Sequence, residues 1–264
     1  MANLTLLKEK YLTRLPSGLV RTDVMPVNPD LRQRDYRLVL DMPGIDQRIG
    51  DTILFDRSGI QPPNHGTIVG ATWRSANGLM TLRYDGDDYV NIDVVLPELA
   101  NTKKGTWMTW VKLDDATPAT SANIITFGDT SASEYILMQI TTTGLLYCAL
   151  NIAGVGQWRL DTDASVISDY TWVHLALIQD GVAPVLLVNG EAVAQAFLLA
   201  TNTTAWFADC AGIDNGRIGC FNYNAGGNIA FITNGNTGFT RIANYDLTQE
   251  RIQAIVASEL GWWL

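Results

Sequence analysis

Residues that often carry chemistry are scarce in this sequence. Its 264 residues include three cysteines and two histidines. Cys148, Cys210 and Cys220 lack Cys-x-x-Cys spacing, so the sequence predicts neither a disulfide framework nor a zinc site, and we expect free, buried thiols. A Cys210–Cys220 disulfide is the alternative in an oxidising compartment. His65 and His174 have no nucleophile nearby in the sequence, and no Gly-x-Ser-x-Gly motif is present, so no catalytic triad is predicted.

Long apolar runs and a surplus of positive charge are missing as well. No run approaches the length of a membrane span, and the N-terminus has neither the uninterrupted apolar core nor the cleavage site of a signal peptide. The net charge of −9 argues against nucleic acid and anionic lipid surfaces as partners. This charge is unevenly distributed, because residues 1–37 carry a net +3 and the remainder therefore carries −12.

What the sequence does have is a succession of short β-favouring runs from residue 38 onward, separated by Gly, Asn, Asp, Thr and Ser. The runs 172–178 and 184–188, each followed by a turn-forming Asp-Gly or Asn-Gly pair, predict an antiparallel hairpin. Both faces of its first strand are largely apolar, and we interpret the exception, His174, as a core histidine bonded to backbone or tyrosine. The pattern predicts an all-β, two-sheet antiparallel jelly-roll sandwich over residues 38–264.

The two ends of the chain depart from this pattern. Residues 1–37 contain scattered prolines and short polar runs, which predict an extended N-terminal arm that needs a partner to become ordered. Near the other end, residues 246–259 change to a helical period, with Thr248 as the N-cap of one surface helix. The terminal Gly-Trp-Trp-Leu predicts an apolar tail docked on the body or on a neighbouring subunit.

Five segments carry specific patterns in a fixed order. They are an Asp-x-Ser-Gly turn and strand in Phe55–Trp73, an aromatic-Asp-Gly turn in Leu82–Ile92, a Trp-Val-Lys strand in Thr106–Leu113, a Trp-x-His-x-Ala to Asn-Gly hairpin in Trp172–Glu191, and an Arg-Ile-x-Asn strand with a helix in Arg241–Val256. Together they resemble the laminin G-like, concanavalin A-like lectin and glucanase family, to which pentraxins are related. The resemblance implies a sandwich that binds glycans, proteins or surfaces, in some members through Ca²⁺.

Some members of that family hydrolyse glucans, with carboxylates spaced Glu-x-Asp-x-x-Glu along one strand. None of the glutamates in this chain starts such a pattern: Glu9, Glu98, Glu134, Glu191, Glu250 and Glu259. We therefore expect a protein that is not an enzyme. A glycoside hydrolase remains the alternative if carboxylates from separate strands converge in one groove.

Two groups of residues are candidates for binding a ligand. Asp85, Asp87 and Asp88 crowd one turn and are a candidate Ca²⁺ site, although Asp-Gly is also what a plain hairpin turn requires. The next oxygen ligands to consider are Asp129, Asp214 and Asn215. For a glycan, the candidates are two tryptophans that would stack on a sugar if exposed and a loop rich in amides: Trp158, Trp206, Asn222, Tyr223 and Asn224. The alternatives are burial of both tryptophans and an ordinary long loop.

A domain of this family is usually a module of an exported protein, whereas this sequence begins at Met1 without a signal peptide. A virus particle released by lysis would bring such a domain outside a cell without secretion. We predict a virion surface protein, such as a bacteriophage head decoration or tail component. Residues 1–37 would bind other virion proteins or further copies in a homo-oligomer, and the sandwich would contact host carbohydrate. The alternative is a carbohydrate-binding, lectin-like module that a cell makes and exports.

Overall fold

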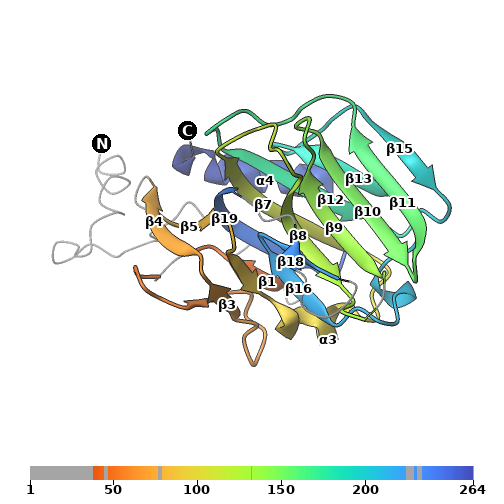
Figure 1. Cartoon of the computed structure of the whole chain (residues 1–264), viewed down its shortest axis with the longest axis horizontal. Coiled ribbons are helices and arrows are strands. Elements are labelled where there is room, and N and C mark those ends of the chain that lie inside the picture. The colour runs from red at the N-terminus through yellow and green to blue at the C-terminus, as the bar shows by residue number, and fades with distance from the viewer. Residues whose placement is uncertain are drawn as a thin grey trace.

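A computed structural model describes residues 38–44, 47–76, 79–131, 133–223, 229–230 and 234–263. The predicted arm, residues 1–37, and the partners expected for it therefore lie outside the described residues. Two antiparallel sheets lie face to face (Figure 1), which confirms the predicted all-β sandwich. Among the described residues, no helix is long and apolar enough to cross a membrane.

Each sheet combines strands that are distant in the sequence. The first sheet contains β14 (Glu191–Ala192), β13 (Pro184–Val188), β12 (Val173–Gln179), β7 (Gly105–Leu113), β19 (Asn234–Ala243), β5 (Leu79–Asp85) and β4 (Thr72–Ala76), in that order, with β1 (Leu38–Met42) also paired to β19. The second contains β15 (Gln195–Ala200), β11 (Val155–Thr162), β10 (Leu146–Ile152), β9 (Tyr135–Ile140), β8 (Ala122–Gly128), β16 (Asn215–Ile218), β6 (Tyr89–Asn91), β3 (Gly66–Val69) and β2 (Ile53–Leu54). The remaining elements are β17 (Phe221–Asn222), β18 (Ile229–Ala230), η1 (Asp93–Val95), α3 (Leu96–Leu99), η2 (Phe207–Asp209), α4 (Gln249–Glu259) and η3 (Leu260–Trp262).

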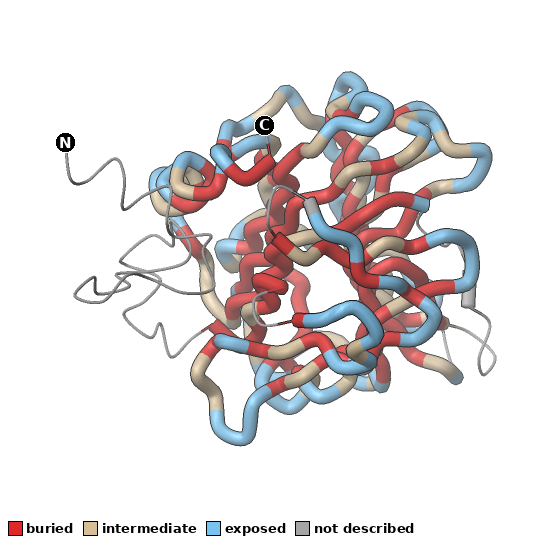
Figure 2. Tube along the Cα trace, turned by 90° about the vertical axis from the view of Figure 1, so that its left-hand side faces the viewer, coloured by how far each residue is buried: buried red, intermediate tan, exposed pale blue. Residues whose placement is uncertain are grey.

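The main core fills the space between the two sheets, where Figure 2 shows buried residues through the interior and exposed ones in the peripheral loops. Alternate residues of each strand enter it, as the period of two requires. Trp107 of β7 lies at its centre, with ring centroids 5.1 Å from Phe127 and 5.4 Å from Trp206. The predicted hairpin is also present, since β12 pairs with β13 from Leu175 opposite Val188 to Gln179 opposite Pro184.

The outer face of the first sheet is covered by the C-terminal helix and tail. Helix α4 begins after Thr248, whose side chain accepts a hydrogen bond from the Arg251 amide at 3.4 Å, as the N-cap prediction requires. The tail then packs Trp263 against this sheet, with its ring centroid 5.6 Å from Trp110 and 4.3 Å from Trp172. The prediction that the Trp-Trp tail docks on the body is therefore confirmed.

Beneath α4 lies a buried group of charged residues. The Arg241 guanidinium contacts Asp41 Oδ1 at 2.9 Å and Glu259 Oε1 at 2.7 Å, and the Trp110 indole N–H donates to Glu259 Oε2 at 2.8 Å. His174 is fully buried beside Trp110, at 5.3 Å between ring centroids. The predicted core position of His174 is confirmed. The expected hydrogen bond to backbone or tyrosine is absent, because its ring nitrogens have no hydrogen-bond partner among the described residues. Burial, with the nearby Arg241 charge, lowers the pKa of His174 to about 3.

All three cysteines are free, which excludes the alternative disulfide in this structure. Cys148 and Cys220 are buried, as predicted, and Cys210 is half-buried. Burial raises the pKa of the Cys220 thiol to about 12, despite the opposing charge of Arg217. These thiols are therefore protonated and weakly nucleophilic at neutral pH.

Candidate functional site

The outer face of the second sheet carries aromatic and polar side chains on three neighbouring strands. In β9, β10 and β11, residues of the main core alternate with residues that point away from it. The antiparallel register places Asp161 opposite Tyr147 and Asn151 opposite Tyr135. Arg159, two residues before Asp161, shares their face. The alternation thus gathers these outward side chains on one surface.

A segment that crosses this face adds a third tyrosine. The chain after β16 turns back so that Phe221 is buried in a small cluster with Leu137 and Ala149. The Phe221 and Tyr223 rings stack with centroids 4.2 Å apart, and Tyr135 meets them edge-on at 5.2 and 5.6 Å. We call the following half-buried or buried group the tyrosine patch: Tyr135, Tyr147, Arg159, Asp161 and Tyr223.

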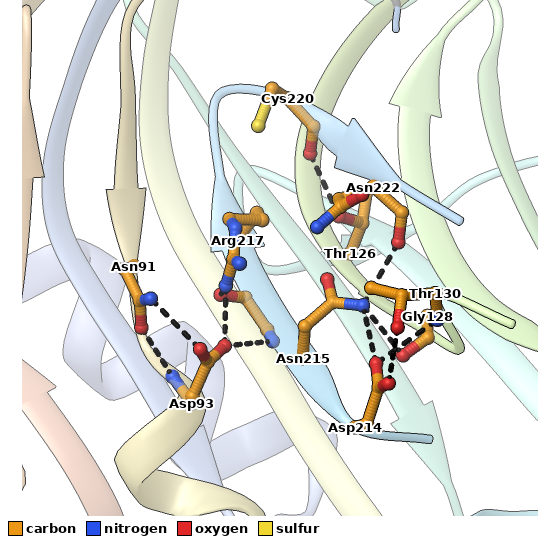
Figure 3. Close-up of polar contacts among 11 residues, drawn as sticks. Asn91, Asp93, Thr126, Gly128, Thr130, Asp214, Asn215, Arg217, Cys220 and Asn222 are labelled. Atoms are coloured by element: carbon orange, nitrogen blue, oxygen red, sulfur yellow. Dashed lines mark hydrogen bonds and ion pairs between the residues drawn. The ribbon is translucent and has the colours of Figure 1, made fainter. Parts of the chain in front are cut away.

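Hydrogen bonds hold the crossing segment on β8 (Figure 3). The Thr126 hydroxyl donates to the Cys220 carbonyl at 2.7 Å. The Asn215 amide nitrogen donates to the carbonyls of Gly128, at 2.8 Å, and Asn222, at 3.0 Å. A Cβ at Gly128 would lie 2.3 Å from the Asn222 oxygen, so only glycine permits this close approach. These contacts position Phe221 and Tyr223.

Arg159 is held between an aromatic ring and a carboxylate. Its guanidinium carbon lies 4.6 Å from the Tyr147 ring centroid. Its Nε and Nη2 donate to Asp161 Oδ1 and Oδ2 at 3.0 and 2.8 Å, a two-point pairing. The hydrogen bond to Asp161 raises the pKa of Arg159. Burial raises the pKa of the Tyr135 and Tyr147 phenols, which are therefore uncharged at neutral pH.

A second arginine on the same sheet repeats this arrangement at a more buried position. Arg217 of β16 lies with its guanidinium carbon 5.5 Å from the Tyr89 ring centroid and pairs with Asp93 (Figure 3). Asp93 also accepts hydrogen bonds from the Asn91 side chain at 2.8 Å and from the Gly216 amide at 2.7 Å. Arg217 is 8% exposed, whereas the side chain of Asp93 is 38% exposed, so the guanidinium of this pair is hidden from solvent and the carboxylate is not.

The two tryptophans considered as sugar platforms lie in the core. Trp158 and Trp206 are both 0% exposed, which corrects their assignment as glycan-binding residues and confirms the alternative of burial. The Trp158 indole N–H donates to the Ala205 carbonyl at 3.1 Å, and the two rings lie with centroids 6.4 Å apart. The Trp158 indole points inward because β11 alternates, whereas Trp206 lies just before η2 and packs its ring against Trp107 in the core.

The loop considered with them is only partly described. Asn222 is 7% exposed and contributes its backbone carbonyl to the contact with Asn215, so its side chain is not presented to a ligand. Tyr223 is half-buried and belongs to the tyrosine patch. Asn224 lies outside the described residues. Of the predicted glycan-binding residues, Tyr223 is therefore the one that the structure places on an accessible face.

The candidate Ca²⁺ residues do converge. Ligand oxygens of Asp85, Asp87 and Asp88 lie within 4.8 Å of one another at the β5–β6 turn. Asp88 is buried and accepts a hydrogen bond from the Asp85 amide at 2.8 Å, which is the ordinary bonding of a tight turn. Calcium takes six to eight oxygen ligands, so three carboxylates are a partial set. Ca²⁺ binding stays a prediction.

The further oxygen ligands considered are engaged in their own loops. Asp129 Oδ1 accepts from the amide and hydroxyl of Ser131 at 2.7 and 2.8 Å. Asp214 accepts from the Thr130 hydroxyl at 2.5 Å and from Asn215 at 2.9 Å. These bonds account for the loop conformations.

The comparisons with known proteins agree with this fold. A family model described as the concanavalin A-like lectin/glucanases superfamily matches residues 84–253. The chain belongs to this superfamily. No curated protein sequence matches the chain. The resemblance read from the five sequence segments is thereby confirmed.

Several solved structures resemble this member of the superfamily. The CBM40 module of the Ruminococcus gnavus IT-sialidase, bound to α2,3-sialyllactose, matches with TM-score 0.51 and 18% identity over 60% of this chain and 84% of the module. The K499G mutant of the Streptococcus pneumoniae NanB sialidase matches with TM-score 0.55 and 16% identity over 66% of this chain and 27% of its own. The leech intramolecular trans-sialidase matches with TM-score 0.52 and 20% identity over 72% of this chain and 27% of its own. At these identities the likeness shows the fold, and this chain spans about a quarter of the two sialidases.

The sequence prediction missed Tyr135, Tyr147 and Arg159. A signal for them exists, because the three strands carry outward Tyr-x-Leu-x-Gln, Tyr-x-Ala-x-Asn and Arg-x-Asp patterns between core residues. Reading it requires knowing that β9, β10 and β11 are neighbours with one face outside the core.

Proposed function

We propose that this protein is a carbohydrate-binding protein without catalytic activity, and that the tyrosine patch contacts the sugar. One observation carries the proposal: three half-buried tyrosine rings and an arginine–aspartate pair lie together on the outer face of the second sheet. Aromatic faces cover the apolar side of a pyranose ring, and phenol, guanidinium and amide groups bond its hydroxyls. The carbohydrate-binding superfamily and the sialyllactose complex of one structural relative support it.

The distribution of carboxylates supports a role without catalysis. Across all the strands of the second sheet, Asp161 is the one acidic residue, and both of its oxygens are bonded to Arg159. Most glycoside hydrolases use two carboxyl groups about 5 to 9.5 Å apart, one of them able to act as an acid or base, although sialidases use a tyrosine as the nucleophile. Asp161 has no such partner within these strands.

The predicted placement on a bacteriophage particle stays a prediction, as does the alternative of an extracellular module. Both depend on residues 1–37, which lie outside the described residues. A glycan-binding face on the acidic sandwich is compatible with either placement.

The test is a glycan array on the full chain, followed by affinity measurements with the tightest neutral or acidic glycan found. Tyr147→Ala removes the ring that supports Arg159, and we expect at least a tenfold loss of affinity, about 1.4 kcal/mol. Tyr170→Ala is the matched control, because Tyr170 is 69% exposed in the loop before β12, away from the patch. Binding that is absent from the array, or that both variants retain equally, contradicts the proposal.

A further inference from the structure

The second sheet contains two basic residues in all its strands, Arg159 and Arg217. Each lies over a tyrosine ring, Tyr147 or Tyr89, and each is paired with an aspartate. Each guanidinium charge is therefore balanced by a carboxylate in direct contact. The sheet repeats one local arrangement, an arginine over a ring with its charge balanced, and Arg159 is the half-buried copy that offers a flat surface and hydrogen-bond donors without net charge.

This pairing limits which glycans the face can hold. A carboxylate on a sugar is bound best by a guanidinium whose two parallel N–H groups are available. The Nε–Nη2 side of the Arg159 guanidinium already donates to Asp161, so its remaining Nη1–Nη2 end offers N–H donors without net charge, and Arg217 is buried and bonded to Asp93. An incoming carboxylate would also meet the Asp161 charge next to the guanidinium, and the residues after 37 carry a net −12.

We propose that the tyrosine patch selects uncharged sugars and discriminates against glycans that end in a carboxylate, sialylated ones included. The inference rests on the proposed function and concerns the ligand class of the same face. It separates this chain from the relative whose structure contains α2,3-sialyllactose, although the fold is shared. The ring of an uncharged pyranose lies on Tyr135 and Tyr147, and Arg159 donates to hydroxyls without having to leave Asp161.

The experiment compares matched glycans on the full chain. An array that carries each neutral core both bare and capped with sialic acid is probed, and the affinities of lactose and 3′-sialyllactose are measured beside the tightest neutral binder and its sialylated form. The expected result is that the sialic acid cap weakens binding at least tenfold. Binding of the neutral glycan changes less than twofold between 0.05 and 0.5 M salt, because no net charge is neutralised.

Two variants test whether the pairing of Arg159 with Asp161 causes the discrimination against sialylated glycans. Asp161→Asn leaves the Arg159 charge unbalanced, and we expect the ratio of sialylated to neutral affinity to rise at least fivefold. Asp163→Asn changes the net charge of the chain equally at an exposed position just beyond β11, and it should leave the ratio unchanged. Thermal melting of both variants shows whether they remain folded, and the wild-type ratio alone tests the inference if Asp161→Asn unfolds.

The outcomes separate the two proposals. If the wild-type chain binds sialylated glycans as tightly as their neutral cores, or more tightly, the inference is overturned and the proposed function stands. If neither class binds, the proposed function fails and the inference fails with it. An equal rise in the ratio for Asp161→Asn and Asp163→Asn contradicts the assigned role of the Arg159–Asp161 pair.

Discussion

The two sheets carry similar chemistry on their outer faces and use it differently. On the first sheet, Arg241 pairs with Glu259 and lies 5.4 Å from the Phe239 ring, and helix α4 seals this group from solvent. On the second, Arg159 pairs with Asp161 over Tyr147 and stays half-buried. The presence or absence of a covering element decides the role. Covered, the pair and its ring hold the C-terminal segment in place; uncovered, they form a face that a ligand can reach.

The largest expected loss of stability follows from disrupting the covered pair, Arg241 and Glu259. Glu259→Ala removes the carboxylate that bonds both Arg241 and the Trp110 indole, which leaves Asp41 as the one ion-pair partner of this buried cation among the described residues. We expect the free energy of unfolding to fall by about 3 kcal/mol, measured by denaturant titration. Glu98→Ala, at an exposed glutamate of α3, is the control and should change it by less than about 0.5 kcal/mol. Equal effects would mean that the buried pair does not hold the helix.

A pH effect of similar size is expected at His174, under the same helix. Its pKa is about 3 in the folded chain and about 6.5 when unfolded, so between these values the unfolded chain binds the extra proton. Stability is thus retained above pH 6.5 and lost as the pH falls toward 3. Relative to His174→Gln, the wild-type chain should lose about 3 kcal/mol between pH 7 and pH 4. The raised pKa values of Asp41 and Glu259 act in the opposite direction but are common to both proteins.

The absence of a difference between wild type and His174→Gln across this pH range would contradict the assigned burial of a neutral imidazole. The comparison is made by chemical denaturation at matched ionic strength, because salt screens the remaining surface charges.

A smaller loss of stability is expected at Asn215, which holds the crossing segment on β8. Asn215→Ala removes the side-chain donor to the Gly128 and Asn222 carbonyls, although Gly128 keeps the bond from the Asp214 amide, and the loss costs about 1–2 kcal/mol of stability. It also loosens Tyr223, and we expect glycan affinity to fall two- to fivefold. Asn101→Ala, at an exposed position in the turn after α3, is the control and should alter neither quantity. If Asn215→Ala leaves the glycan affinity unchanged, the crossing segment does not take part in glycan binding.

The smallest stability effect is expected within the patch itself. Tyr147→Ala removes a half-buried ring that packs on a small cluster outside the main core, so the free energy of unfolding should fall by less than about 1.5 kcal/mol. The same substitution reduces glycan affinity strongly. A loss of stability as large as that of Glu259→Ala would mean that Tyr147 is a structural residue like those under α4.

The fold could be predicted from the sequence because its information is local. Period-two strands, turn pairs and the Thr248 cap each act within a few residues, and five such segments in order specify the sandwich. The Trp-Trp tail could be predicted for the same reason, since two adjacent tryptophans need cover. Free cysteines followed from their spacing and number.

The proposed binding face could not be predicted from the sequence in this way. Its residues belong to three strands and a crossing segment, and only the pairing of β9, β10 and β11 places Tyr135, Tyr147 and Arg159 on one surface. Trp158 and Trp206 were considered as exposed sugar platforms, and both are buried. Polar neighbours in the sequence suggested exposure, whereas strand direction and the Trp107 cluster decided that both rings are buried.

The most direct test of the central claim is a crystal structure of the full chain with the tightest-binding neutral glycan from the array. The account predicts a sugar ring lying against Tyr135 and Tyr147, with hydroxyls bonded to Arg159 while Arg159 remains paired with Asp161. A sugar bound instead at the β5–β6 turn near Asp85, with the tyrosine patch empty, would contradict it.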